Sequence, residues 1–119
     1  MNSVLKTVFG LNNANIQEVG SMEDARISFD PTYVRPGEDF QVYYHGLLEN
    51  SGADQIYLHY GFDNWSTNLG TIPMNRIENG SFKATIKASG NHELNFCFKD
   101  SAANWDNNNG YNWSMHLQS

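Results

Sequence analysis

The 119-residue chain is short of cationic residues and of cysteine. Seven Lys and Arg residues stand against thirteen Asp and Glu residues, which gives a net charge of −6. A nucleic-acid-binding domain normally carries a basic patch, so this composition argues against nucleic acid as a partner. The single cysteine, Cys97, excludes an internal disulfide and any zinc site built from several cysteines.

Long apolar runs are also missing. No stretch reaches the length of a transmembrane helix, so no membrane partner is expected. Residues 1–11 contain only broken apolar pairs, far short of the apolar core of a secretory signal. If Met1 is the native start, the sequence predicts a cytoplasmic protein; if the chain is a module from a larger enzyme, it predicts a secreted one.

The N-terminal residues, 1–24, differ from the rest of the chain. Val4, Leu5, Val8 and Phe9 recur with a helical spacing. This pattern predicts an N-terminal arm or short helix that packs on the domain or serves as a docking or oligomerisation segment.

Residues 25–119 carry short alternating segments separated by turn residues such as Asn79-Gly80, the strongest hairpin signal in the chain. The expected strands are residues 26–30, 39–48 (with Gly46 at a bulge or bend), 55–62, 71–77, 81–87, 94–99 and 111–117, and residues 63–70 are expected to form a polar loop. This pattern predicts an all-β domain, an antiparallel two-sheet immunoglobulin-like β-sandwich. A small barrel fits the same periodicity.

The three tryptophans have different surroundings in the sequence. Trp65 and Trp105 lie in polar loops, where a large apolar ring serves either to bind a ligand or to cap an end of the sandwich. Trp113 alternates with Met115 and Leu117 and is therefore predicted to lie in the core.

His59 is expected on the outward face of its strand, between Tyr57 and Gly61. An imidazole ring can hydrogen-bond a sugar hydroxyl and also offer a flat surface. The loop around Trp105 is rich in asparagine, whose amide donates and accepts hydrogen bonds without adding charge. These residue types together favour a binding site for a neutral sugar.

Three stretches in this order resemble carbohydrate-binding module family 25, a family of starch-binding modules: VYYHGLLENSGADQIYLHYGFDNW, IPM and LNFCFKDSAANWDNNNGYNW. The resemblance spans residues 27–113. It implies a β-sandwich that binds α-1,4-linked glucans (starch, amylose, maltooligosaccharides or glycogen) without catalysis or a cofactor. It also implies a tethered or partner amylase-type enzyme.

Carried over to this chain, the resemblance implies three stacking residues and three hydrogen-bonding ones, namely His59, Trp65 and Trp105, and Asn107, Asn108 and Asn109. The chain departs from the family in two places. The loop at residues 63–66 is shorter than in some members, and residues 1–24 have no counterpart.

Three other functions fit parts of the sequence less well. Asp63, Asp100 and Asp106 lie near the expected site and raise the possibility of glycoside hydrolysis, but aspartates in such loops more often shape turns. A protein-interaction sandwich that uses the apolar N-terminal segment remains the alternative to glucan binding.

Metal binding is not expected. Asn104, Asp106 and Asn108 imitate the start of a calcium loop, but Asn109 stands where glycine is needed and Met115 where the final acid is needed. The histidines lie too far apart in the sequence for a zinc motif: His45, His59, His92 and His116.

Overall fold

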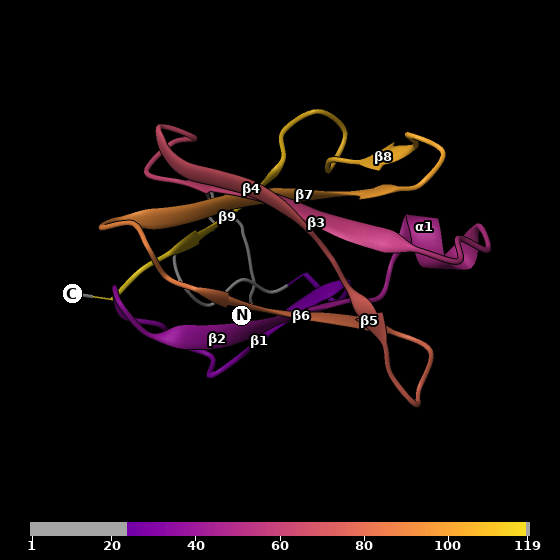
Figure 1. Ribbon diagram of the computed structural model, residues 1–119, viewed down its shortest axis with the longest axis horizontal. Coiled ribbons are helices and arrows are strands. Elements are labelled where there is room, and N and C mark those ends of the chain that lie inside the picture. The colour runs from indigo at the N-terminus through magenta and orange to yellow at the C-terminus, as the bar shows by residue number, and fades with distance from the viewer. Residues whose placement is uncertain (1–23, 119) are drawn as a thin grey trace, which may run out of the picture.

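The computed structural model describes residues 24–118, which form two antiparallel sheets packed face to face (Figure 1). The described elements are β1 (Ile27–Asp30), β2 (Asp39–Tyr44), α1 (Leu47–Asn50), β3 (Ile56–Phe62), β4 (Thr67–Pro73), β5 (Asn75–Arg76), β6 (Phe82–Lys87), β7 (Glu93–Asp100), β8 (Trp105–Asp106) and β9 (Trp113–His116). The lower layer in Figure 1 has the strand order β1-β2-β6-β5, and the upper layer has β4-β3-β7-β8, with β9 also paired to β7. The sandwich prediction is confirmed.

The core lies between the layers and is built from the inward face of each strand. In β6, for example, Phe82, Ala84 and Ile86 are buried, whereas Thr85 and Lys87 are exposed. The largest fully buried side chains are Tyr44, Phe40, Phe62, Phe82, Phe96 and Phe98. Each such ring contributes about 1.5–3 kcal/mol by leaving water, so this aromatic layer supplies the stability that holds the outer faces in place.

The second expected strand ends earlier than the sequence predicts. Residues 39–48 were expected to be extended, but β2 stops at Tyr44 and the chain turns into α1. The Tyr44 hydroxyl accepts a hydrogen bond from the backbone N–H of Leu48 at 3.0 Å, which secures this turn. Gly46 lies against the same ring, where an added Cβ would come within 2.9 Å of it. The glycine therefore marks a bend, as expected, and the bend ends the strand.

The hairpin around Asn79-Gly80 is only partly as predicted. β5 and β6 do pair across this turn, with Asn75 opposite Lys83. The preceding strand, expected as one unit over residues 71–77, is divided between the layers: β4 ends at Pro73 in the upper sheet, and β5 belongs to the lower sheet. β4 also begins at Thr67, within the expected polar loop. Its start was not predicted because β4 is an exposed strand at the edge of the sheet and lacks a clear apolar alternation.

The C-terminal part of the chain forms an interrupted edge strand. β8 and β9 both pair with β7, so residues 107–112 stand opposite the single residue Cys97. Trp105, expected in the middle of a loop, lies in β8 and pairs with Lys99. The loop of residues 107–112 rises from the outer side of the upper layer (Figure 1).

The predicted N-terminal helix or arm lies outside the described residues, except for its last residue. Asp24 accepts hydrogen bonds from the Arg26 side chain and from the indole N–H of Trp113, so it is tied to the sandwich. Nothing among residues 24–118 is a helix with the length and apolar character needed to cross a membrane.

Candidate functional site

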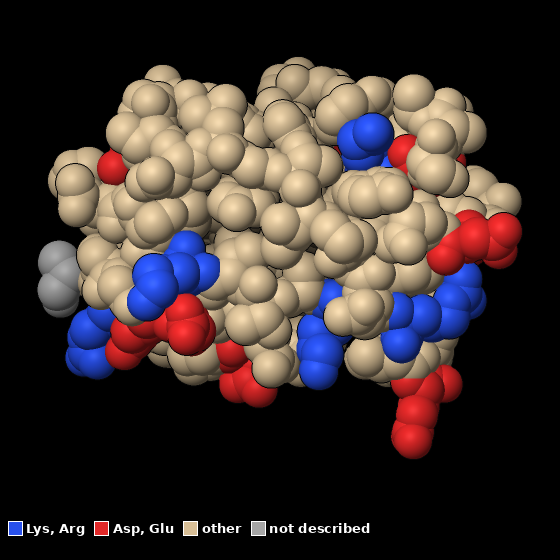
Figure 2. All heavy atoms as spheres, viewed as in Figure 1, with Lys and Arg blue, Asp and Glu red and all other residues tan. Residues whose placement is uncertain are grey.

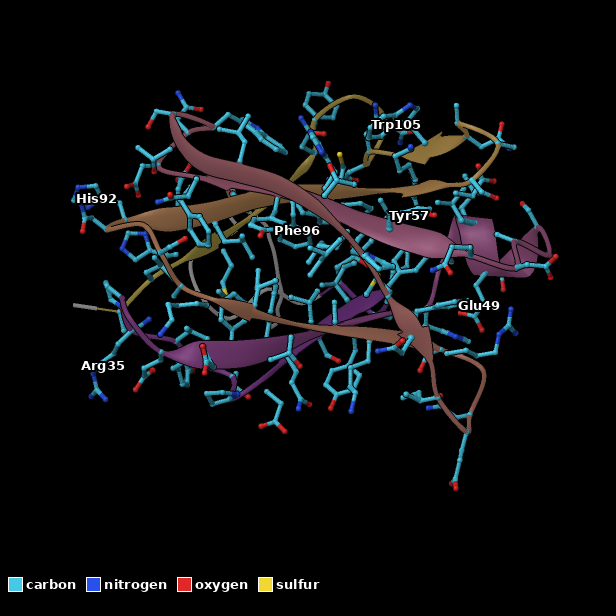
Figure 3. All side chains as sticks on the ribbon, in the orientation of Figure 1. Arg35, Glu49, Tyr57, His92, Phe96 and Trp105 are labelled. Carbon is cyan, nitrogen blue, oxygen red and sulfur yellow. The ribbon has the colours of Figure 1, made fainter. Side chains whose placement is uncertain are left out.

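The outer face of the upper sheet carries a row of large side chains that register places side by side. Tyr57 in β3 is opposite Lys99 in β7, and Lys99 is opposite Trp105 in β8. In the next outward row, His59 of β3 lies between Thr71 of β4 and Cys97 of β7. Pairing thus brings together side chains from four segments of the chain, and the labelled Tyr57 and Trp105 both lie on this layer (Figure 3).

His59 lies between the two candidate tryptophans. Its ring centroid is 5.5 Å from that of Trp65 with an interplanar angle of 26°, a stacked arrangement. It is also 5.5 Å from that of Trp105, but at 82°, an edge-to-face arrangement. The Trp105 side chain is 45% exposed. The three rings expected to form one site therefore meet, and the Trp105 ring lies nearly perpendicular to that of His59.

Trp65 is positioned by a turn with an unusual backbone. Asp63, Asn64 and Trp65 have φ values of 56°, 64° and 61°, so three consecutive residues other than glycine adopt the left-handed conformation. Such residues cost about 1–3 kcal/mol each and persist where the surrounding structure holds them, most often at functional sites. The backbone N–H of Ser66 closes the turn on the carbonyl of Phe62 at 2.9 Å.

The Asp63 carboxylate helps to hold this turn. It accepts hydrogen bonds from the backbone N–H groups of Asn91, His92 and Glu93 at 2.7–3.2 Å. These bonds favour the charged form and lower the pKa of Asp63 below its ordinary value. The carboxylate proposed from sequence as a catalytic candidate therefore connects the Trp65 turn to the start of β7.

Gly61 forms the floor beneath Trp65, a role that the sequence reading missed. A Cβ added to Gly61 would lie 3.0 Å from Cε3 of Trp65 and 3.2 Å from Cγ of Leu69. Gly61 faces outward, as predicted, but it is buried because the indole covers it. The available signal was a glycine inside a strand, which often marks a close approach by another group.

Asn95 provides a second anchor for Trp65. Its side-chain oxygen accepts the backbone N–H of Trp65 at 3.0 Å, and its amide nitrogen donates to Glu93 at 2.6 Å. Asn95 is 5% exposed, although the alternation of β7 puts it on the outer face. The Trp65 turn covers it.

His59 is held in a defined orientation and in its neutral form. Its Nδ1 lies 2.7 Å from the Thr71 hydroxyl. Burial, and then the positive charge of Lys99, lowers the pKa of His59 below its ordinary value of 6.5. A neutral imidazole keeps one nitrogen as a donor and the other as an acceptor, which suits it to hydroxyl groups.

The three asparagines that were expected to contact the ligand have different roles in the loop of residues 107–112. The side-chain oxygen of Asn107 accepts the backbone N–H of Gly110 at 3.0 Å, and the amide nitrogen of Asn108 donates to the carbonyl of Asn112 at 3.0 Å. Asn109 is exposed at the tip of the loop and has a φ of 57°. Asn107 and Asn108 thus shape the loop, whereas the Asn109 amide makes no hydrogen bond to any other residue of the described part of the chain.

Cys97 lies under this surface rather than on it. It is on the outward face of β7 yet only 4% exposed. Burial, and then the negative charge of Asp106, raises the pKa of its thiol to about 11. The side chain is a buried thiol and not a nucleophile.

The other two candidate carboxylates are also engaged in structure. Asp100 accepts hydrogen bonds from the side-chain amide of Asn104 at 2.9 Å and from the backbone N–H groups of Asn104 and Ala102 at 2.8 and 2.9 Å, and these bonds lower its pKa. Asp106 is 5% exposed and accepts the Tyr44 hydroxyl at 2.6 Å. Within residues 24–118, His, Cys, Asp and Glu side chains form no group of three or more that could hold a metal ion.

Trp113 is separate from this site. It is 4% exposed, its ring stacks on Phe96 at 6.0 Å and 18°, and the Arg26 guanidinium lies 5.0 Å above it. The prediction of a core role for Trp113 is confirmed. Two exposed apolar side chains in the upper layer were not predicted: Leu69, 58% exposed in β4, and Tyr111, 84% exposed in the loop of residues 107–112.

Comparison with known proteins indicates the class of ligand. Residues 40–96 match the model of a starch/carbohydrate-binding module family, family 53. An α-amylase from Clostridium acetobutylicum is 36% identical over 95 residues, which are 79% of this chain and 12% of that enzyme. The chain thus spans a small fraction of this relative's length. No solved structure matches the chain.

The matching model is that of family 53 and not family 25, so the finer assignment from sequence is not supported by the match. Family 25 and family 53 are both families of starch-binding modules. The domain is a starch-binding carbohydrate-binding module.

Proposed function

We propose that His59, Trp65 and Trp105 bind α-1,4-linked glucan chains on the outer face of the upper sheet and leave them chemically unchanged. The observation that carries the proposal is the angle between the rings: 26° between His59 and Trp65, and 82° between His59 and Trp105. An α-1,4-linked chain winds as a shallow helix, so its sugar faces turn progressively. Rings set at an angle can follow that curve, whereas a coplanar row would suit a flat chain.

Each ring contributes a flat apolar surface for the C–H face of one glucose unit. The hydroxyl groups at the rim of that unit need donors and acceptors, which the neutral His59 and the exposed amide of Asn109 offer. Asn107 and Asn108 contribute chiefly by holding the loop that carries Asn109 and Tyr111.

The expected affinity is modest. Each stacking contact at an open surface is worth roughly 1–2 kcal/mol, against several kcal/mol of lost freedom on association. A single site should therefore bind with a Kd on the order of micromolar to millimolar. Firm retention on a polysaccharide then requires repeated sites or tethered modules.

A purely binding role is also what the carboxylates favour. Glycoside hydrolysis requires a pair of carboxyl groups facing the ligand across a cleft. Asp63 and Asp100 cap backbone N–H groups, and Asp106 is buried against Tyr44. None is free to act as acid or nucleophile, so we expect no release of reducing ends from starch.

The setting of the module is a separate proposal. The likeness to part of an α-amylase supports a role beside an amylase-type catalytic domain. In a secreted enzyme the ligand would be starch outside the cell. A cytoplasmic protein would instead encounter glycogen. The residue strings that resemble family 25 leave that finer family as our expectation, to be tested by ligand preference.

Affinity-gel electrophoresis in amylose, glycogen and cellulose tests this proposal. The parent should be retarded by amylose and glycogen and not by cellulose, and Trp65→Ala and Trp105→Ala should each lose most of the retardation. Tyr33→Ala is the matched control, because Tyr33 is a similarly exposed aromatic residue (59%) between β1 and β2 of the other sheet. If both tryptophan variants migrate like the parent, the proposed site is wrong.

A further inference from the structure

Lys99 is the one cation on the face that carries the proposed site. No other Lys or Arg occurs in β3, β4, β7, β8 or β9, or in the loops of residues 63–66, 101–104 and 107–112. Most Lys and Arg side chains gather along the lower half of the molecule, whereas the upper half shows a single basic group, with acidic atoms beside it (Figure 2). A lysine is therefore unusual on this surface.

The ammonium group of Lys99 is held among the site's own rings. Its Nζ lies 5.8 Å from the ring centroid of Trp105 and 5.4 Å from that of Tyr57. Contacts of this kind orient a cation without neutralising it. Within residues 24–118, Lys99 forms no ion pair with a carboxylate.

The carboxylates nearest to Lys99 along the chain have other partners. Asp100 points its carboxylate into the loop of residues 101–104, and Asp106 is buried against Tyr44. The Lys99 ammonium can donate hydrogen bonds to the hydroxyl groups of a neutral glucan, but, among the described residues, it also leaves an unpaired positive charge beside the stacking rings. An anionic group on the glucan would pair with it directly.

We propose that Lys99 makes this site prefer α-glucan chains that carry a phosphate monoester over the neutral chain. The inference rests on the proposed glucan site, since the phosphate would be brought to Lys99 by a chain stacked on Trp105 and His59. Lysine binds phosphate as a point charge, and a charge-assisted hydrogen bond is about twice as strong as a neutral one. The phosphate alone, without the stacked sugars, would bind too weakly to compete.

The test compares neutral maltoheptaose with maltoheptaose monophosphorylated at a 6-hydroxyl, by isothermal titration calorimetry on the full chain. The parent should bind the phosphorylated ligand about five- to tenfold more tightly at low ionic strength, and the preference should shrink at about 1 M salt, where charges are screened beyond about 3 Å. Lys99→Met keeps the length and apolar contacts of the side chain and should bring the ratio of affinities to about one. Lys83→Met, on the opposite sheet, is the matched control and should leave the ratio unchanged.

Each outcome has a distinct meaning. If the parent binds both ligands equally, or if Lys99→Met keeps the preference, the inference is wrong. It is also wrong if Lys99→Met weakens both ligands by the same factor, because the lysine would then only position Trp105. Inorganic phosphate and glucose 6-phosphate should show no measurable binding, and binding of either by the parent would point to a phosphate site independent of the glucan. Failure of the parent to bind even neutral maltoheptaose would refute the glucan site itself.

Discussion

Gly61, which lies directly beneath the Trp65 ring, offers the sharpest test of how the binding surface is held in place. In Gly61→Ala, the new methyl group would stand 3.0 Å from Cε3 of Trp65 and 3.2 Å from Cγ of Leu69. Ordinary contacts of this kind begin near 3.4 Å, so the indole must move outward by a few tenths of an ångström. The movement disturbs its stacking on His59 and its alignment with the ligand.

Gly61→Ala has two opposing effects on the free energy of unfolding, whereas its effect on glucan binding is in one direction. Replacing glycine by alanine restricts the unfolded chain and stabilises the fold by about 0.4–1 kcal/mol, which offsets a strain of similar size. The free energy of unfolding should therefore change by less than about 1 kcal/mol. Loss of about 1 kcal/mol of stacking would weaken glucan binding about fivefold.

A double-mutant cycle separates this effect from a general disturbance of the sheet. Maltoheptaose affinity by calorimetry and urea unfolding are measured for Gly61→Ala, Trp65→Ala and the double variant. Once the indole is absent, the methyl group meets chiefly the exposed Leu69 side chain, which can move aside, so Gly61→Ala should no longer weaken binding, and it should stabilise the fold. Parent-like binding by Gly61→Ala, or the same loss of stability with and without the indole, would refute this account of the platform. The second criterion remains measurable if Trp65→Ala leaves little binding.

Three further predictions follow from the site and its surroundings. Trp105→Ala should weaken glucan binding at least about tenfold while changing stability by no more than about 0.5 kcal/mol, whereas Trp113→Ala should cost about 3–5 kcal/mol in urea unfolding; equal destabilisation by the two would contradict their assignment to surface and core. Burial, and then the Lys99 charge, lowers the pKa of His59, so the ring is neutral above pH 6.5. Glucan affinity should therefore be constant above pH 6.5 and fall only below it. The free energy of unfolding should also decline as the pH falls through 6.5, because the unfolded chain takes up the proton more readily than the folded one. NMR titration should give a higher His59 pKa in Lys99→Met, and a lower one would reverse the assigned cause. Since burial, and then the Asp106 charge, raises the pKa of Cys97 to about 11, alkylation of the native thiol at mildly alkaline pH should be at least about tenfold slower than in urea; equal rates followed by mass spectrometry would show that Cys97 is accessible.

The parts of the fold that follow a simple period were predictable. Alternation placed Phe82, Ala84 and Ile86 in the core and Trp113 with them, and Asn79-Gly80 marked the hairpin. The division of residues 71–77 between two sheets was not visible, because crossing from one layer to the other changes no local preference. β8 is only two residues long, which is too short to show the alternation of a strand, so the sequence predicted a loop position for Trp105.

The meeting of His59, Trp65 and Trp105 was predicted, but the means by which they are held was not. A left-handed turn without glycine leaves no local signal in Asp63-Asn64-Trp65, since it is stabilised by backbone groups from residues 91–93 and by Asn95. Tyr111 was expected to begin the last strand but lies in the loop before β9, and Leu69 was expected in a polar loop but lies in β4. Long-range hydrogen bonds and the pairing of β7 with β8 decide these positions.

The interruption between β8 and β9 also bears on how copies of this domain behave when crowded. A sheet edge with a continuous row of free N–H and C=O groups accepts a strand from another molecule. Here the edge beside β7 consists of two residues in β8 and four in β9, separated by a loop in which Asn108, Asn109 and Asn112 have positive φ. Neither short run offers enough groups for stable pairing. Pairing between copies through this edge is therefore disfavoured, and the loop between the two runs is free to change in length without shifting the register of β7.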